Sequence, residues 1–457
     1  MKNFLKKAFL ALFVISVVSC SDDDDTVFTP DVMTIADFVT DNSEYSSLLA
    51  ALQRTNLDVT LNGTGTFTVF APNNAAFAEF LDGTALDDVP VETLEQILLN
   101  HVLGTTQMST DLTTGYVKNL ASETTTGANI SMYINTASGV VINGESTVID
   151  PDIMTDNGVI HAVDKVIPLP TMLTFVGLDS DLSSLAAVAT TTSGFDTDFE
   201  AVLNGADSNL TLLAPDNDAF TALGDISGLP VADLEQILLN HVLAGVNVSA
   251  SLSTGYGNTL ATYGDTMANL SIYINTASGV SFNGISDVDE ADIVTTNGVI
   301  HKVGTVITLP TVVTFATADA TFSSLVAALT RDDQLDENYV ATLSTANGTA
   351  PAPFTVFAPT DDAFASLLTE LGASSLADIA EATLTATLNL HVVAEANVRA
   401  EDLMSGVVTT LGGDITVDAM NTTLTDANDR VSNIIVTNVQ AANGVIHAID
   451  KVILPAL

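Results

Sequence analysis

The stretch FTVFAPNNAAF at residues 67–77 occurs three times in this chain, the other copies being LTLLAPDNDAF at 210–220 and FTVFAPTDDAF at 354–364. The apolar first half of each copy is typical of a buried strand. The proline that follows cannot donate to a strand ladder, so we expect the strand to end there. Each copy therefore predicts a buried strand that turns directly into a helix.

The helix at this corner is predicted from its capping and anchoring residues. The position after each proline holds a different residue, but all three are competent N-caps: Asn73, Asp216 and Thr360. Four residues further on comes a phenylalanine that we expect to pin the helix to the core: Phe77, Phe220 and Phe364. Three different caps at one position indicate a geometric requirement rather than a chemical one.

The six histidines repeat with the same period. Three follow leucine-rich segments, LLNHVL twice and LNLHVV once: His101, His241 and His391. Three close the string NGVIH: His161, His301 and His447. The period is close to 140 residues, which is the size of a whole domain rather than of a solenoid repeat. A chain of 457 residues has room for about three such domains.

The remaining pattern predicts both helices and strands in each copy. In LEQILLNHVL at 94–103, the histidine falls on the apolar face of a helix with Leu94, Ile97 and Leu98. Alternating segments such as ISMYIN predict strands, and Asn157-Gly158 predicts a tight turn before the closing strand VIHAVDKVI. Proline-bearing linkers make the row of domains semi-rigid. The predicted α+β domains span residues 33–169, 172–309 and 312–455.

The charge balance excludes some classes of partner. The chain has 56 acidic and 11 basic residues, for a formal net charge of −45. Nucleic-acid binding requires a cationic surface, so we expect no nucleic-acid partner. Loosely held divalent cations are compatible with this charge, and the DSD string at 179–181 is suggestive of calcium. The full EF-hand loop pattern is absent, which favours solvated surface carboxylates instead.

An N-terminal leader is expected at residues 1–19. Three lysines precede an apolar run at 8–18 that is too short to span a bilayer and has the length of a signal-peptide core. Val17-Val18-Ser19-Cys20 resembles the lipobox of bacterial lipoproteins, with valine where leucine is usual. That resemblance implies lipidation of Cys20; an ordinary cleaved signal peptide is the alternative. Cys20 is the only cysteine, so no intramolecular disulfide is possible.

Residues 20–32 are predicted to form an acidic tether. Ser21 and the four aspartates at 22–25 are similar to the tract that sends lipoproteins of Bacteroidetes-type bacteria to the outer face of the outer membrane. A solvated, self-repelling tether explains the same charges. We expect a lipid-anchored protein of the cell envelope, at the outer membrane and surface-exposed.

The three ordered motifs resemble the signature of the fasciclin (FAS1) domain family. They are the TVFAP-x-x-x-AF corner, the HVV/HVL box after a helix and the NGVIHxID-like final strand, over about residues 33–455. The resemblance implies three tandem α+β domains, each a wedge of two β-sheets with packed helices. It also implies adhesion or matrix interaction, the usual role of the family.

One segment of the first copy invites a functional interpretation. Pro151-Asp152-Ile153-Met154 looks like a segment proposed to bind integrins in a human matrix member of the family. The second copy has Ala291-Asp292-Ile293-Val294, and we align Asn433–Val436 with it in the third. An Asp-Ile pair that enters the closing strand is ordinary for this fold, so we favour a structural role.

The histidines are the only candidates for a catalytic or metal site. With Asp164 and Asp450 they could coordinate zinc or act as general bases. Gly304 replaces that aspartate in the second copy, and a histidine on an apolar helix face more often hydrogen-bonds the backbone. No nucleophile elbow, P-loop or HExxH motif is present. We therefore expect structural histidines, no catalytic residue, no metal and no cofactor.

The sequence thus favours a non-enzymatic, membrane-anchored adhesion protein with a protein or glycan partner at the cell surface, in which repetition supplies avidity. The alternative is a glycan- or small-ligand-binding accessory lipoprotein, which needs an exposed aromatic platform. Tyr116 and Tyr256, each in a TGY string, are the candidates for such a platform, although a turn-and-packing role is favoured.

Overall fold

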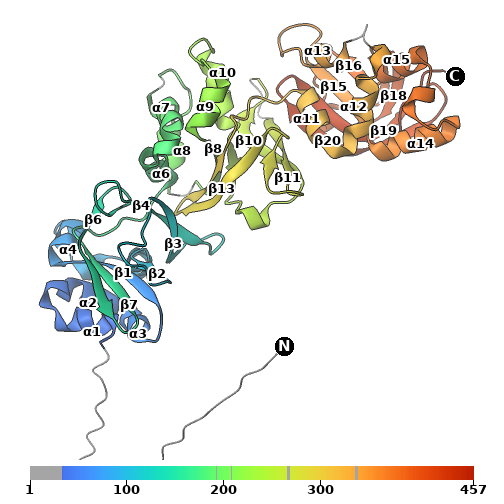
Figure 1. Cartoon of the computed structure of the whole chain (residues 1–457). Coiled ribbons are helices and arrows are strands. Elements are labelled where there is room, and N and C mark those ends of the chain that lie inside the picture. The colour runs from blue at the N-terminus through green and yellow to red at the C-terminus, as the bar shows by residue number, and fades with distance from the viewer. Residues whose placement is uncertain (1–32, 192, 207, 265–267, 335–337, 457) are drawn as a thin grey trace, which may run out of the picture.

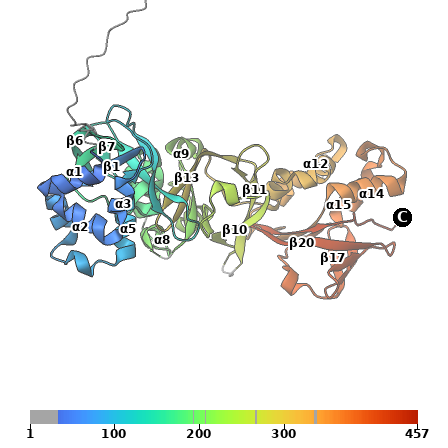
Figure 2. The same cartoon turned by 90° about the horizontal axis from the view of Figure 1, so that it is seen from below.

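The computed structural model describes residues 33–191, 193–206, 208–264, 268–334 and 338–456. Cys20 and the acidic tract lie outside the described residues. Figure 1 shows three domains in an extended row, from the first in blue to the third in orange and red, and Figure 2 shows the same row from below. The predicted α+β class is confirmed, because each domain combines helices with a seven-stranded mixed sheet.

Each domain contains the same succession of helices and strands, as the bounds show. The first domain has α1 (Ile35–Asp41), α2 (Ser46–Thr55), α3 (Leu57–Asn62), β1 (Phe67–Pro72), α4 (Asn74–Leu81), α5 (Val91–Leu99), β2 (Val102–Leu103), β3 (Gly115–Ser122), β4 (Asn129–Asn135), β5 (Val141–Ile142), β6 (Ser146–Thr155) and β7 (Gly158–Val163).

The second domain repeats this order with α6 (Met172–Leu178), α7 (Ser183–Thr191), α8 (Phe199–Asn204), β8 (Leu210–Pro215), α9 (Asn217–Leu223), α10 (Val231–Leu239), β9 (Val242–Ala244), β10 (Gly255–Thr262), β11 (Asn269–Asn275), β12 (Ser281–Phe282), β13 (Ser286–Thr295) and β14 (Gly298–Val303).

The third domain has α11 (Val312–Ala318), α12 (Ser323–Leu329), α13 (Tyr339–Leu343), β15 (Phe354–Pro359), α14 (Asp361–Leu371), α15 (Glu381–Asn389), β16 (Val392–Ala394), β17 (Gly406–Thr410), β18 (Gly413–Asp418), β19 (Thr423–Thr425), β20 (Val431–Ala441) and β21 (Gly444–Ile449).

The strand order is β2-β1-β7-β6-β5-β4-β3 in the first domain, and only the β1–β7 pair is parallel. The first two residues of the long strand β6 pair with β5, and from Val148 onward it pairs with β7, with register shifts on both sides of Asp150 that mark a bend in the strand. This bend gives the two-sheet wedge that the resemblance implies. The second domain also pairs β9 with β10, which closes its strands into a barrel.

The strand-to-helix corner has the predicted geometry in all three copies. The N-cap side chain accepts a hydrogen bond from the helix backbone in each: Asn73 from Ala76, Asp216 from Ala219 and Thr360 from Ala363. Phe77 and Phe364 are fully buried as expected, whereas Phe220 stays partly exposed. The corner therefore sets the direction of α4, α9 and α14 against the sheet.

The closing turn requires glycine because two strands approach closely there. A Cβ on Gly158 would lie 2.1 Å from the carbonyl oxygen of Phe67, the first residue of the parallel partner β1. The corresponding contacts of Gly298 and Gly444 would be 2.2 and 2.3 Å. No other residue fits this point without displacing β1, β8 or β15.

Each domain has a hydrophobic cluster under its helices and another inside its strand wedge. The helix-side cluster of the second domain includes Tyr133 of the first domain, and that of the third includes Tyr273 of the second. The domains are therefore packed together through their cores. Among the described residues no single helix is long and apolar enough to cross a bilayer; two bent helix pairs pass on length and composition alone.

Candidate functional site

The first histidine of each domain is a buried packing residue. His101 lies just past the end of α5 rather than within the helix, which corrects the sequence expectation. Its Nδ1–H donates to the carbonyl of Ile97 at 2.7 Å, and its Nε2 accepts the backbone N–H of Ile167 at 2.8 Å. Burial lowers the pKa of this ring to about 4. His241 bonds the carbonyl of Ile237 and the N–H of Ile307 in the same way, and His391 bonds those of Thr387 and Ile453; burial lowers both pKa values to about 4.

The second histidine of each domain connects the closing strand to a loop. His161 Nε2–H donates to the carbonyl of Gln107 at 2.9 Å, and Nδ1 accepts the backbone N–H of Asp152 at 3.1 Å. The same bonds form at His301 and at His447, and burial lowers the pKa of both. Both nitrogens of all six rings are occupied by backbone groups, so none is available as a ligand or a base.

The carboxylates expected near these histidines are elsewhere. Asp164 accepts the backbone N–H of Thr147, and Asp450 accepts that of Asn433, so neither meets a histidine. The nearest carboxylate to His161 is Asp152, at 3.9 Å. Its counterpart in the third domain is the neutral Asn438. Within the described ranges, no three His, Cys, Asp or Glu side chains gather where they could hold a metal ion.

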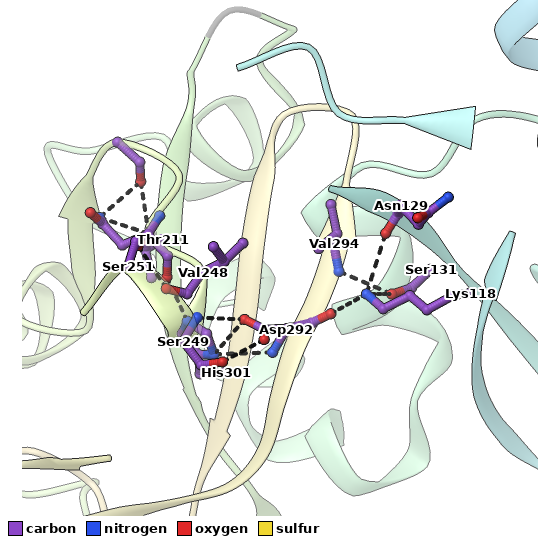
Figure 3. Close-up of polar contacts among 12 residues, drawn as sticks. Lys118, Asn129, Ser131, Thr211, Val248, Ser249, Ser251, Asp292, Val294 and His301 are labelled. Carbon is purple, nitrogen blue, oxygen red and sulfur yellow. Dashed lines mark hydrogen bonds and ion pairs between the residues drawn. The ribbon is translucent and has the colours of Figure 1, made fainter. Parts of the chain in front are cut away.

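The Pro151–Met154 segment forms the bend of β6. Asp152 has φ 63°, and its carboxylate accepts the N–H and the hydroxyl of Ser109. These bonds hold the pKa of Asp152 below its usual range. In Figure 3, Asp292 makes the same contacts with Ser249 beside His301. The third copy was misaligned from sequence: Thr437–Gln440 is its counterpart, because Asn438 is the residue that bonds His447.

The two junctions between domains are built from equivalent residues. At the first, the Tyr116 ring lies 5.1 Å from the Phe175 ring of the next domain, and its hydroxyl donates to Asp179 at 3.1 Å. At the second, Tyr256 packs on Phe315 at 5.7 Å and donates to Asp319 at 3.0 Å. Both tyrosines are half-buried here and form no free aromatic platform.

Backbone contacts reinforce both junctions. The hydroxyl of Ser131 on β4 accepts the N–H of Val294 on β13 at 3.0 Å, as Figure 3 shows. Ser271 on β11 accepts the N–H of Gln440 on β20 at 2.9 Å. Both serines are buried. One domain is therefore fixed to the next at the bend of its long strand, beside Asp292 or Asn438.

Two lysines fill the first junction. Figure 3 shows Lys118 donating across it to the carbonyl of Asp292. Lys302 lies 3.0 Å from both Asp179 and Glu290, 3.6 Å from Asp181, and its ammonium is 5.8 Å from the centre of the Tyr116 ring. Burial lowers the pKa of Lys302, but hydrogen bonds to Asp179 and Glu290 outweigh it and raise that pKa.

The ion pairs of Lys302 change the interpretation of the Asp-Ser-Asp sequence at residues 179–181. Asp179 is buried and paired with Lys302, so it is neither a solvated surface carboxylate nor free to bind calcium. At the second junction Lys118 and Lys302 have no counterparts. Strand register places Asn258 and Ala448 at those positions.

The two ends of the row differ from the junctions. Met154 is 59% exposed on the first domain, whereas its counterparts Val294 and Gln440, covered by a preceding domain, are 1% and 0% exposed. On the third domain, the register of β17 and β18 places Val407 where Tyr116 stands and Asp414 where Ser131 stands. The outward face of the third domain therefore lacks the groups that form a junction.

Comparison with known proteins identifies the class. The fasciclin domain family matches the chain three times, over residues 43–170, 180–310 and 320–455. The chain therefore belongs to the fasciclin domain family, with three tandem FAS1 domains.

Its relatives include long tandem proteins and short ones. The chain is 28% identical over 429 residues to the transforming growth factor-beta-induced protein ig-h3 of Sus scrofa, covering 90% of this chain and 56% of the relative. It is 29% identical over 451 residues to human periostin, covering 94% and 48%. The chain thus spans about half the length of these curated relatives. Protein sll1483 of Synechocystis is 36% identical over 147 residues, 32% of this chain and 77% of that protein.

A solved FAS1 domain pair from the insect cell adhesion molecule fasciclin I aligns with 58% of this chain and 97% of its own, at 19% identity and a TM-score of 0.38.

The junction residues are what sequence reasoning missed. The sequence singles out Tyr116 and Tyr256 as candidates for an aromatic platform, with a turn-and-packing role favoured, but not as junction residues. A usable signal was present: the TGY string occurs only in the first two copies, each of which has a domain after it.

Proposed function

We propose that this protein is a non-enzymatic adhesion module of the cell envelope, anchored through a lipid on Cys20 and directed outward from the outer membrane. Three FAS1 domains then present their outer surfaces to a protein or glycan partner. The observation that carries the proposal is the repeated junction, in which Tyr–Phe packing, a Tyr–Asp hydrogen bond and a buried serine recur.

A fixed row suits attachment for a physical reason. Domains on loose linkers lose conformational entropy when several of them bind one surface, whereas a rigid row has already lost it. The net charge of −45 keeps the row soluble and repels other copies. The buried histidines, whose ring nitrogens are all bonded to backbone, are consistent with a structural role. Similarity to the transforming growth factor-beta-induced protein ig-h3 and to periostin over 90% and 94% of this chain supports an adhesion-related role.

Attachment is tested on cells that carry the full-length protein. Cells with the whole chain should adhere to a partner surface more strongly than cells with a variant that keeps residues 1–32 and lacks the three domains. Immunoblotting confirms equal surface amounts. Equal adhesion of the two strains would overturn the proposal.

The anchor is tested separately. Cys20→Ser should abolish labelling by a palmitate analogue and release the protein from membranes, while a matched Ser19→Ala variant stays labelled. Protease treatment of intact cells should then cleave the wild-type domains. Protection of the domains until the outer membrane is opened would contradict the outward orientation.

A further inference from the structure

The second junction contains a cleft at the place where Lys302 stands in the first junction. The cleft has a volume of about 620 Å³ and is bordered by Tyr256, Asp319, Thr321, Val436 and Ala448. These five residues are the counterparts of Tyr116, Asp179, Asp181, Glu290 and Lys302 at the first junction. The tyrosine and the first aspartate are kept, and the lysine is replaced by alanine.

Lys302 shows what this arrangement accommodates. Its ammonium lies beside the Tyr116 ring and within 3.0 Å of the buried Asp179 carboxylate. A lysine stem packs readily against apolar surface while its ammonium meets a carboxylate. The second junction retains the aromatic ring and the carboxylate but supplies no ammonium.

Asp319 is consequently a buried acid without a counter-charge. It is 7% exposed, and its bonds come from the Tyr256 hydroxyl, from the N–H and hydroxyl of Thr321 and from the Tyr273 side chain. Among the described residues, no lysine, arginine or histidine forms an ion pair with it. A buried carboxylate held only by neutral donors is stabilised further when a cation approaches it.

The geometry points to a binding site for an alkylammonium group, of the kind that a lysine side chain of a partner protein presents. The cleft is far larger than a metal ion needs, and Val436 and Ala448 provide apolar wall for an alkyl chain. Oδ1 of Asp319 already accepts both Thr321 bonds, which leaves no free pair of oxygens for a bidentate guanidinium. Asp361 and Asp362 at the rim add negative charge.

The site is tested with Nα-acetyl-lysine amide as the probe, followed by NMR of methyl-labelled alanine in the full-length protein. Saturable shifts are expected at Ala448. The uncharged Nα-acetyl-norleucine amide, which has an alkyl chain without the ammonium, should produce none. Equal binding of the two probes would overturn the proposal.

Two substitutions that give each junction the residue of the other, Ala448→Lys and Lys302→Ala, make the test specific. Ala448→Lys supplies the missing ammonium from within and should weaken binding of the probe at least about tenfold. The matched control Ala346→Lys adds the same charge on an exposed loop and should change affinity less than about twofold. Lys302→Ala should open a second site at the first junction, raising the stoichiometry from one to two. Unchanged binding by Ala448→Lys would contradict the site.

The source of the ammonium is distinguished by two further probes. A Gly-Gly-Lys-Gly-Gly peptide tests a lysine within a polypeptide, and 1,5-diaminopentane tests a free amine. Binding of the diamine without the peptide would overturn the assignment to a protein lysine. The binding measurements use isolated protein, so their failure would overturn the lysine site and leave the adhesion proposal untouched. Equal adhesion of the two strains would overturn the adhesion proposal and leave the lysine site untouched.

Discussion

Buried polar side chains join distant segments of each FAS1 domain. Asn157, at the closing turn, accepts the N–H of Ile35 and donates to the carbonyls of Leu61 and Gly63. It thereby ties the first helix, the third helix and the last strand together. Asn297 and Asn443 make the same three bonds in their own domains.

Replacement of this asparagine should destabilise one domain strongly. Asn157→Ala leaves the N–H of Ile35 and the carbonyl of Leu61 buried without partners, and each such group costs about 1–3 kcal/mol. We expect a loss of at least about 2 kcal/mol in the first domain, measured by hydrogen exchange of peptides from α1 and α3. The exposed Asn421→Ala should stay within about 0.5 kcal/mol. Similar exchange in both variants would show that the bonds are dispensable.

The buried histidines predict a pH dependence of stability. The rings of His101, His241 and His391 have a pKa of about 4 in the folded protein, against about 6.5 in an unfolded chain. The unfolded state therefore binds more protons between these values. Their contribution is fully present above pH 6.5 and is lost as the pH falls towards 4, by about 3 kcal/mol for each ring.

Unfolding midpoints measured from pH 7 to pH 4 should follow this loss, and ring ¹⁵N spectra should show neutral imidazoles down to about pH 4. His391→Gln should flatten the dependence of the third domain while leaving the first two unchanged. Rings that titrate near 6.5 would contradict the burial.

At this scale the sequence indicated structural histidines but not their partners. A leucine-rich segment predicts burial of His101, whereas the bond from Ile167 joins residues 66 positions apart. Asn157 was assigned to a turn, which it occupies, but its three side-chain bonds depend on the packing of α1 and α3. Local pattern carries no information on such distant partners.

Among the elements, the strand-to-helix corner was the most predictable. Its strand, proline, cap and phenylalanine are contiguous, so their effects are local. The equivalent of the β6 bend in the third copy was misaligned by four residues, because Asn433–Val436 is closer in hydrophobic pattern to Pro151–Met154 than the true counterpart Thr437–Gln440 is. The strand register, and not the pattern, places Asn438 opposite His447.

The corner predicts which substitutions of the cap are tolerated. Asp216→Ala removes the bond to the N–H of Ala219 and should cost about 1 kcal/mol. Asp216→Asn and Asp216→Thr reproduce the caps of the other two domains and should cost only a few tenths. Thermal unfolding of the second domain measures the series. An equal loss in all three variants would mean that the charge, not the geometry, matters.

The whole molecule is organised by its two junctions. Each inserts tyrosines of one domain against the helix-side core of the next. The sequence predicts a semi-rigid row from short proline linkers. The structure adds side-chain packing and hydrogen bonds across each junction, a second means of holding the domains that the linkers do not reveal.

Loss of one tyrosine should loosen one junction. Tyr116→Ser removes an aromatic pair contributing about 0.5–1.5 kcal/mol and the bond to Asp179, whereas Tyr116→Phe removes only the bond. Spin labels at Glu79→Cys and Thr221→Cys, with Cys20 replaced by serine, report the distance between the first two domains. We expect a narrow distribution in the parent protein, a broad one with Tyr116→Ser and an intermediate one with Tyr116→Phe.

Tyr256→Ser is the control, since it should leave this distance unchanged. A distribution that stays narrow in Tyr116→Ser would show that the tyrosine is not what holds the junction.

The outward face of the third domain has a consequence for crowded conditions. A head-to-tail contact that does not close into a ring builds a filament when every molecule presents both of the surfaces that form the contact. In the third domain Val407 and Asp414 stand where the tyrosine and the serine of a junction stand. Contact between this face and the exposed Met154 face of another molecule therefore lacks the Tyr–Asp and serine hydrogen bonds that join domains within the chain.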